Sequence, residues 1–366
     1  MTIDGRLIIA GRRAAGEGGF LTSKSPATLE DVGQAHLASS AQCRDAVAAA
    51  KAAFPGWRDT RAEERRRVLR AAGRVLLRRA DEAARLLSLE KGSPLAESLG
   101  TEVQGGLTIL DYYGRVEPTS LKRQSVTPHT ALFASKKCAF NFQPLGPTLV
   151  ISPWNFPLII PFSDVVGALA AGNTVVLRPS TSTPLVALLL GEVLLEAGLP
   201  PGALNVAVCR TPQAEEMILH PDIRTVMFTG SVGVGKRIME LASRNLTNIV
   251  LELGGKDPMI VLPDADLERA ARGAVWAAFM NCGQSCASVE RLYVAREIEA
   301  EFTARVVTLA GELKVGDPLE PGTDIGPMTT LGQLETVLGH LRDAREKGAR
   351  VLVGGGRVEG RSGYFL

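Results

Sequence analysis

The sequence has little of what marks membrane proteins or nucleic-acid-binding proteins. Its 41 Lys and Arg residues against 39 Asp and Glu give a formal net charge of +2 over 366 residues. A balance this close to neutral implies neither a nucleic acid nor an anionic membrane surface as a partner. The apolar run Leu185–Leu199 is too short to span a bilayer, and Glu192 and Glu196 interrupt it. We therefore expect a protein without membrane spans.

Cysteines paired at metal-binding spacing are also missing. The odd total of five is scattered over Cys43, Cys138, Cys209, Cys282 and Cys286. Cys282 and Cys286 lie four residues apart, but no histidine or second cysteine pair accompanies them, so we expect no metal site. Unpaired thiols are typical of a reducing compartment. The start, Met1–Gly5, lacks the charged and then apolar pattern of a signal peptide. These features predict a soluble, cytoplasmic protein.

The first third of the chain predicts mainly helices. Residues 1–40 look turn-rich, with one short strand at Leu7–Ile9 and a loop at Gly16–Gly19. Apolar residues then recur at three- and four-residue spacing over Ala41–Phe54 and Thr60–Lys91, which predicts amphipathic helices. Thr60, with Glu63 three residues later, predicts a capping box for the second helix.

Two apolar runs at Thr130–Ser135 and Lys137–Phe142 predict a pair of strands between helical regions. Such a hairpin is either an arm that reaches a partner subunit or a part of the chain's own sheet, and the pattern favours neither.

From Gly146 to Gly255, short apolar runs alternate with helical stretches such as Leu185–Ala197. The predicted strands are Thr148–Ile151, Thr174–Leu177, Asn205–Val208, Thr225–Phe228 and Asn248–Leu251. This alternation predicts a parallel sheet with helices on both faces, whose ligands bind beyond the carboxyl ends of the strands. A second α/β region follows, with the predicted elements Pro258–Leu262, Leu267–Met280, Arg291–Val294 and Ile298–Leu313.

Four short stretches at or after these strands contain residues suited to catalysis or ligand binding. In Ser152–Pro157, the Asn155 amide can donate to a developing oxyanion, or it can satisfy its own turn. Phe228–Lys236 joins a strand to a helix through several glycines and can present backbone amides to an anion, although Gly230, Gly233 and Gly235 lack the usual dinucleotide spacing.

In Leu251–Lys256, Glu252 stands among apolar residues, and partial burial is expected to raise its pKa towards that of a general base. The alternatives are a carboxylate that caps the next element or one that pairs with Lys256. The fourth stretch, Phe279–Ser288, places Cys286 in a Gly-containing loop, where a thiol can face a cleft. A lone loop cysteine is more often a small buried apolar residue.

The order of the four motifs is more specific than any one of them. In this order the chain resembles the aldehyde dehydrogenase superfamily: Pro-Trp-Asn-Phe-Pro comes first, then Phe-Thr-Gly-Ser, then Glu-Leu-Gly-Gly-Lys, and then Gly-Gln-Ser-Cys. The resemblance extends from about Ala41 to the end. It implies NAD(P)-dependent oxidation of an aldehyde to an acid through a cysteine thiohemiacetal and thioester. It also implies a Rossmann-like cofactor domain (1–119 and 143–254), an oligomerisation hairpin (120–142) and a catalytic domain (255–366).

By this resemblance, Cys286 is the nucleophile, Glu252 the base, and Asn155 shares the oxyanion hole with the Cys286 backbone amide. Glu252 favours hydrolysis over acyl transfer to coenzyme A. The implied cofactor-binding residues are Ser152, Pro153, Trp154, Arg178, Ser180, Thr181, Phe228, Gly230, Ser231 and Gly235. Ile160 and Ser163 are candidates to line the substrate tunnel.

The stretch Leu177–Thr181 departs from the family's Lys-Pro-Ser-Glu pattern through Arg178 and Thr181. An arginine can bind phosphate bidentately, and loss of the glutamate removes a like-charge penalty, so we expect NADP to be accepted as well as NAD. The family's later Glu-x-Phe-Gly-Pro stretch would follow Phe365, so the chain resembles a truncated member. The resemblance implies a homo-dimer or tetramer, provided that the missing part is not essential. The alternatives are a silent homologue with a binding or assembly role, and a thiol esterase without cofactor.

Overall fold

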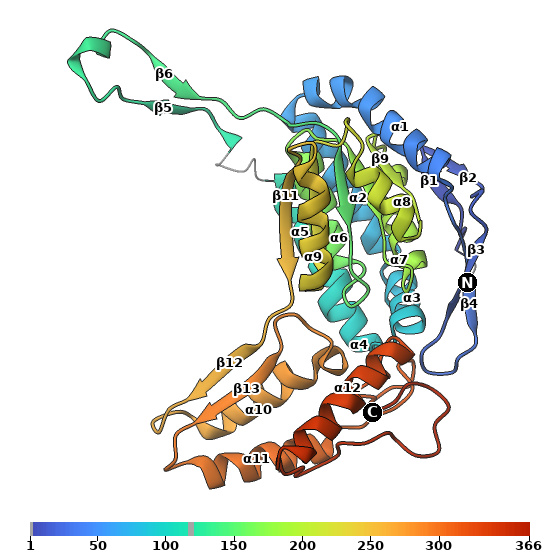
Figure 1. Cartoon of the computed structure of the whole chain (residues 1–366), viewed down its shortest axis with the longest axis vertical. Helices are drawn as coiled ribbons and strands as arrows, with labels where there is room; N and C mark the ends of the chain where they lie inside the picture. The colour runs from blue at the N-terminus through green and yellow to red at the C-terminus, as the bar shows by residue number, and fades with distance from the viewer. Residues whose placement is uncertain (1–2, 116–120) are drawn as a thin grey trace.

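The computed structural model describes residues 3–115 and 121–366 and contains a large α/β unit, a smaller α/β unit and a projecting hairpin (Figure 1). The predicted α/β class is confirmed. The predicted boundary between residues 119 and 120 lies outside the described residues. Within the described ranges, no helix combines the length and apolar character needed to cross a membrane.

A seven-stranded sheet forms the centre of the large unit. In spatial order it contains β11 (Asn248–Leu253), β10 (Thr225–Gly230), β7 (Thr148–Ile151), β8 (Val175–Arg178), β9 (Leu204–Val206), β1 (Leu7–Ile9) and β2 (Arg12–Ala14). The first five strands are parallel, and β1 and β2 are antiparallel. All five parallel strands were predicted to within two residues at each end. Residues 3–40 hold four strands rather than one.

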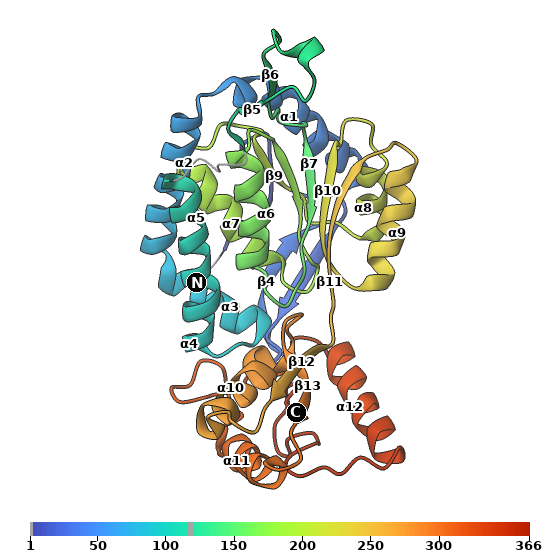
Figure 2. The same cartoon turned by 90° about the vertical axis from the view of Figure 1, so that its left-hand side faces the viewer.

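Helices cover both faces of this sheet, as its continuous apolar strands require (Figure 2). One face carries α1 (Ser40–Asp59), α8 (Thr211–Ile218) and α9 (Val232–Ser243). The other carries α6 (Ile159–Ala170) and α7 (Pro184–Glu196), with α2 (Ala62–Arg78), α3 (Ala80–Lys91) and α5 (Gln104–Arg115) outside them. The short α4 (Leu95–Glu97) and a π-helical turn (Ser98–Val103) connect α3 to α5.

The predicted capping box at Thr60 is wrong. Helix α1 continues through Pro55 to Asp59, and the Thr60 hydroxyl donates to Gly56 O at 2.8 Å, which closes α1 instead of opening α2. The predicted second helix is divided at Arg79, whose guanidinium donates to Glu82 and Glu192.

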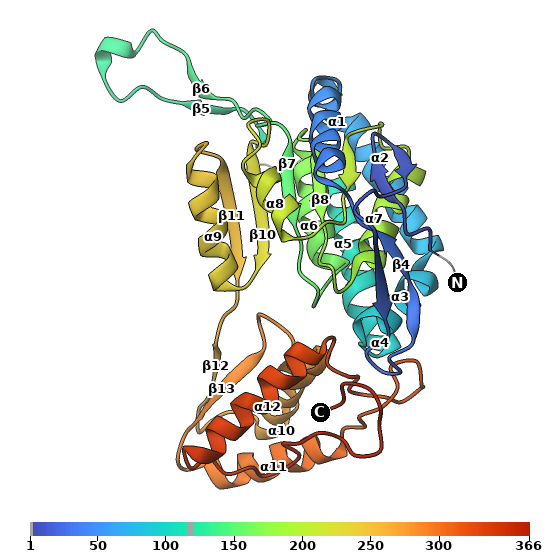
Figure 3. The ribbon, with the colours of Figure 1, turned by 45° about the vertical axis from the view of Figure 1, so that its right-hand side comes forward.

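The hairpin extends away from both units (Figures 1 and 3). Its strands are β5 (Gln124–Val126) and β6 (Cys138–Phe140), paired antiparallel in a sheet of their own. The predicted strand at Thr130–Ser135 is wrong: residues 131–133 form a 3-10 turn in which Thr130 Oγ1 accepts from Leu132 N. Leu132 is 82% exposed, so no buried face holds this run extended. A second ribbon, β3 (Phe20–Lys24) and β4 (Asp31–His36), lies beside α3 and α7.

The smaller unit follows the carboxyl end of β11. It contains the parallel pair β12 (Asp257–Val261) and β13 (Val289–Val294), with α10 (Leu267–Phe279), α11 (Glu299–Glu312) and α12 (Leu331–Glu346). Its core is small, built around Val261, Ala271, Ala274 and Phe302. Because β11 leads into this unit, the carboxyl ends of all the parallel strands face it (Figure 2).

Candidate active site

The loop after α10 has an unusual backbone. Asn281, Cys282 and Gly283 follow one another with φ of 54°, 56° and 71°, in the left-handed region that only glycine enters without cost. This turn reverses the chain and carries it towards the carboxyl edge of the large sheet. Strained backbone of this kind costs about 1–3 kcal/mol per residue and concentrates at functional sites.

The turn separates two cysteines into different surroundings. Cys286 is exposed, whereas Cys282 is partly buried with its Sγ 3.4 Å from Met328 Sδ. Burial raises the pKa of the Cys282 thiol to about 12. Since only a thiolate is a good nucleophile, Cys282 is unsuited to attack, and Cys286 is the accessible thiol of the loop.

Asn155 contacts the same loop. Its segment leaves β7, and its Nδ2 donates to Gln284 O at 3.0 Å, 129 residues away in the sequence. The side chain does not satisfy its own turn, which was the alternative considered from sequence. An amide nitrogen carries two hydrogens, so this bond fixes the plane of the amide and leaves one hydrogen to donate elsewhere.

Glu252 is placed differently from the expectation. It is exposed, because β11 is the edge strand of the sheet and its alternate residues face away from α9. The predicted partial burial is therefore wrong. The predicted alternative pairing with Lys256 is also wrong, since Lys256 Nζ lies 2.8 Å from Glu290. The chain after Glu252 does approach the loop: a Cβ added to Gly255 would lie 3.3 Å from Cys286 O.

Asp164, on α6, is a second carboxyl near Glu252. Burial and the charge of Glu252 raise the pKa of Asp164 to about 6. Because its ordinary pKa is lower, the folded protein loses stability as pH rises through about 6, where this carboxyl ionises in a poor environment. Nothing in the sequence around Asp164 indicates this proximity, because α6 and β11 are far apart along the chain.

Replacing Asp164 by asparagine is expected to stabilise the protein at pH 8, by roughly 2 kcal/mol, and to change little at pH 4. The asparagine keeps the shape of the side chain and carries no charge at either pH. Urea unfolding of both proteins at the two pH values measures this difference. An equal shift at both pH values would show that packing, and not ionisation, is responsible.

The turn between β10 and α9 has free space around Gly233 and close packing around Gly230 and Gly235. Ser231 caps α9, its Oγ accepting from Val234 N, and Gly233 has no neighbour within 4 Å of an added Cβ. A Cβ on Gly230 would lie 2.5 Å from the Phe228 ring, and one on Gly235 would lie 2.8 Å from Leu253. The buried Phe228 ring therefore packs against Gly230, and Leu253 packs against Gly235. A side chain at either glycine would prevent this packing. The free amides at the α9 start suit an anion.

Unsatisfied polar atoms gather at the carboxyl ends of β7 and β8. Ser152 Oγ and Arg178 Nε are buried without a hydrogen-bond partner among the described residues. Arg178 Nη2 donates to Cys209 O at 3.0 Å, so part of its guanidinium is already bound. Ser180 and Thr181 follow, half-buried, and Trp154 is half-buried after the buried Pro153. Buried polar groups are rarely left unpaired, so these atoms indicate a ligand.

The chain was compared with protein-family models and solved structures. The model of the aldehyde dehydrogenase family matches residues 14–366. This chain belongs to the aldehyde dehydrogenase family. The resemblance inferred from the four motifs is thereby confirmed, and the chain is an aldehyde dehydrogenase by family.

Solved structures of the family superpose closely on the chain. An E. coli NADP-dependent enzyme is 34% identical, with a TM-score of 0.94, and 99% of this chain matches 75% of that one. PnpE from Pseudomonas sp. WBC-3, solved with nicotinamide adenine dinucleotide, is 35% identical (TM-score 0.94; 99% and 74% covered). Succinate-semialdehyde dehydrogenase from Burkholderia pseudomallei is 32% identical (TM-score 0.95; 99% and 75% covered). The chain spans about three quarters of the length of these solved chains.

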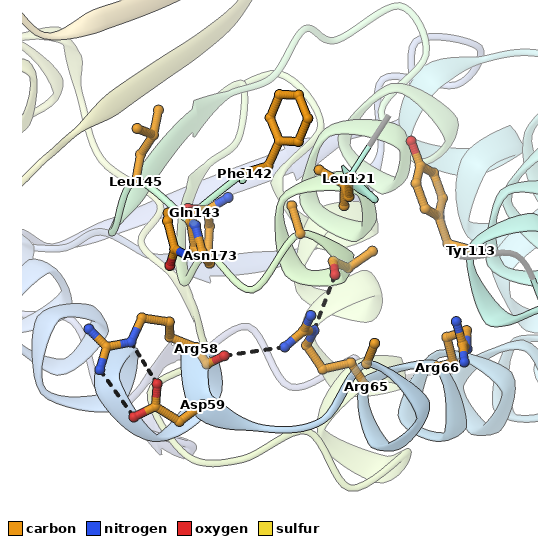
Figure 4. Close-up of a pocket in the computed structure, with 14 residues that line it drawn as sticks. Arg58, Asp59, Arg65, Arg66, Tyr113, Leu121, Phe142, Gln143, Leu145 and Asn173 are labelled. Carbon is orange, nitrogen blue, oxygen red and sulfur yellow. Dashed lines mark hydrogen bonds and ion pairs between the residues drawn. The ribbon is translucent and has the colours of Figure 1, made fainter. Parts of the chain in front are cut away.

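A cavity at the base of the hairpin lies apart from this region (Figure 4). It has a volume of about 470 Å³ and contains three arginines, Arg58, Arg65 and Arg66, but none of the predicted site residues. Arg58 donates to Asp59, and Arg65 Nε donates to Ala170 O at 3.1 Å. Because these guanidinium groups are held by the chain itself, the arginines support the fold here.

Proposed function

We propose that the chain oxidises an aldehyde to a carboxylic acid with NAD or NADP, with Cys286 as the nucleophile. The observation that carries this proposal is the hydrogen bond from Asn155 Nδ2 to the backbone of the loop that bears the exposed Cys286. It brings an amide donor and an accessible thiol into one small region, which is the arrangement that acyl chemistry on a carbonyl needs.

The first step belongs to Cys286. Its thiolate attacks the aldehyde carbon, and the carbonyl oxygen becomes an oxyanion. The hydrogen of Asn155 Nδ2 that is not bonded to Gln284 O then donates to this oxyanion, together with the Cys286 backbone amide. Donors fixed in advance lower the barrier because they need not reorganise as charge develops. The ground-state bond to Gln284 O supplies this fixation.

The residues at the strand ends fit a dinucleotide. The unpaired Ser152 Oγ and Arg178 Nε, and the exposed amides at Ser231 and Gly233, are donors that support binding of a diphosphate and a ribose. Trp154, Ser180 and Thr181 border the same edge. When bound there, the nicotinamide supplies the hydride acceptor of the reaction. Relatives solved with NAD and with NADP agree with both cofactors.

Glu252 completes the reaction by activating water. Oxidation leaves the acyl group on Cys286 as a thioester, and the Glu252 carboxylate removes a proton from the water that attacks it. The exposed position of Glu252 gives it direct access to solvent water. Gly255, three residues later, lies against the Cys286 backbone and keeps this segment beside the thioester. Release of the acid regenerates the thiol.

Thr181 is proposed to allow NADP binding. Replacing Thr181 by glutamate is expected to lower kcat/KM with NADP by tenfold or more relative to NAD, because a carboxylate would repel the 2′-phosphate. Thr181→Val, which removes the hydroxyl without adding charge, is the matched control and should keep the cofactor ratio. Steady-state kinetics with both cofactors measure it. A large NAD preference in the parent protein that Thr181→Glu leaves unchanged would contradict the assignment.

The activity is tested by following formation of the reduced nicotinamide, by its absorbance, with a panel of short aliphatic, aromatic and charged aldehydes. Turnover that requires NAD or NADP supports the proposal. Ester hydrolysis in the absence of nucleotide, without aldehyde oxidation, would favour a thiol esterase. A folded protein that turns over neither class would favour the silent binding or assembly protein.

We also infer a homo-dimer or tetramer in the cytoplasm. The hairpin exposes Leu132, Phe133 and Phe140, at 82%, 48% and 61%, on an arm that its own chain does not cover. An isolated two-stranded hairpin is marginally stable, so a second subunit is the natural partner for it. All five cysteines are free, which suits a reducing compartment.

A further inference from the structure

A closed ring of hydrogen bonds joins Asn155 to the loop of Cys286. The side-chain Nδ2 of Asn281 donates to Asn155 O at 2.9 Å and to Gln284 O at 3.1 Å. Asn155 Nδ2 donates to that same Gln284 O at 3.0 Å. Both hydrogens of the Asn281 amide are therefore used, and Asn155 is held by its backbone at one point and by its side chain at another.

Asn281 is also the residue where the left-handed turn begins. The residue is 2% exposed. Asparagine accepts a positive φ better than other non-glycine residues, since its short amide can bond locally. Asn281 thus begins the turn of the Cys286 loop and also binds the segment that contains Asn155.

Gln284 ties the ring to the rest of the molecule. Its Nε2 donates to Asn281 O at 3.0 Å, and its Oε1 accepts from Thr329 N at 3.0 Å. The Thr329 hydroxyl donates to Lys91 O at 2.8 Å, at the end of α3. These groups are buried, so the bonds are protected from competition with water. The ring is consequently fixed relative to both units of the fold.

We propose that Asn281 is a positioning residue that acts on the reaction through Asn155. This inference rests on the proposed function, in which the free hydrogen of Asn155 Nδ2 binds the oxyanion. Without the Asn281 amide, Gln284 O keeps one donor, and the backbone of Asn155 loses its link to the loop. The donor and the Cys286 sulfur then lose their fixed separation, and a displacement of about 1 Å can cost 10²-fold in rate.

The test is a double-mutant cycle with Asn281→Gly and Asn155→Ala. Glycine reaches a φ of 54° freely, so Asn281→Gly removes the two donors without straining the turn. Alone, it is expected to lower kcat by about 10- to 100-fold and to change KM by less than about threefold. In the Asn155→Ala background, the same substitution is expected to change kcat by less than about threefold, because its target is gone.

Cys282→Gly is the matched control, since it relaxes the neighbouring left-handed residue and keeps the ring; its kcat should equal that of the parent. If Asn281→Gly fails to fold, as thermal unfolding would show, Asn281→Ser is used in the same cycle with the same expected coupling, because its single hydroxyl hydrogen cannot serve both Asn155 O and Gln284 O. If the loss of kcat in Asn281→Gly persists in the Asn155→Ala background, or if Asn281→Gly changes only thermal stability, the positioning role of Asn281 is overturned. The proposed function is unaffected by either result. Unchanged kcat in Asn155→Ala itself overturns the oxyanion role and this inference together.

Discussion

Replacing Cys286 by alanine is expected to reduce aldehyde oxidation by about 10⁴-fold or more, because the variant lacks the sulfur that forms the thiohemiacetal in the proposed reaction. Alanine is smaller and uncharged, and the side chain is exposed, so the fold should be unaffected. The rate of reduced-nicotinamide formation at saturating aldehyde and cofactor measures the loss. Cofactor binding, followed by quenching of tryptophan fluorescence, should remain.

Cys282→Ala is the matched control for this experiment. Its thiol lies four residues away in the same loop, but it is partly buried against Met328 and its pKa is raised to about 12. Alkylation of the parent protein with iodoacetamide should modify Cys286 before Cys282 and abolish turnover. Full activity in Cys286→Ala, or loss of activity only in Cys282→Ala, would show that the nucleophile has been assigned to the wrong sulfur.

Replacing Glu102 by leucine is expected to destabilise the protein by about 3–5 kcal/mol, the largest stability effect that we expect from a single substitution. Glu102 and Lys91 are 0% and 1% exposed, and their charged groups lie 2.7 Å apart. Glu102 also accepts from Leu158 N and Ile159 N at the start of α6. The variant leaves the buried Lys91 ammonium without its hydrogen-bonded carboxylate, beside the Phe156 ring.

The double variant Lys91→Met/Glu102→Leu should recover much of this loss, because apolar side chains of similar size replace both charges. Asp343→Asn, which breaks an exposed i,i+4 pair with Lys347, is the control and should leave the unfolding midpoint unchanged. Urea unfolding followed by circular dichroism measures all three. A loss in Glu102→Leu no greater than that in Asp343→Asn would contradict the assigned role of the buried pair.

The four motifs could be recognised from the sequence because each consists of residues that are close together in the chain. A glycine turn after a parallel strand, an Asn between aromatics and prolines, and a Cys after Gly-Gln-Ser each have a purely structural alternative, but their order along the chain indicated the family. The five parallel strands were equally readable, since a strand buried on both faces is an uninterrupted apolar run. Strand β7, Thr148–Ile151, is buried at every position.

The errors arose where burial depends on distant parts of the chain. Glu252 lies among apolar residues, as a buried residue would, but β11 is an edge strand and exposes every second side chain. Thr130–Ser135 has a strand composition, but nothing covers it and it forms a 3-10 turn. Helix α12, Leu331–Glu346, was not predicted at all.

The sequence by itself determined the α/β class, the order of the parallel strands along the chain and the family, because these depend on residue type and short spacing. Only the tertiary structure decided which groups meet. The ring of Asn155, Asn281 and Gln284, the proximity of Asp164 to Glu252 and the burial of Cys282 beside an exposed Cys286 each join segments distant in the chain. Such contacts follow from how helices and strands pack, and a linear pattern does not record that packing.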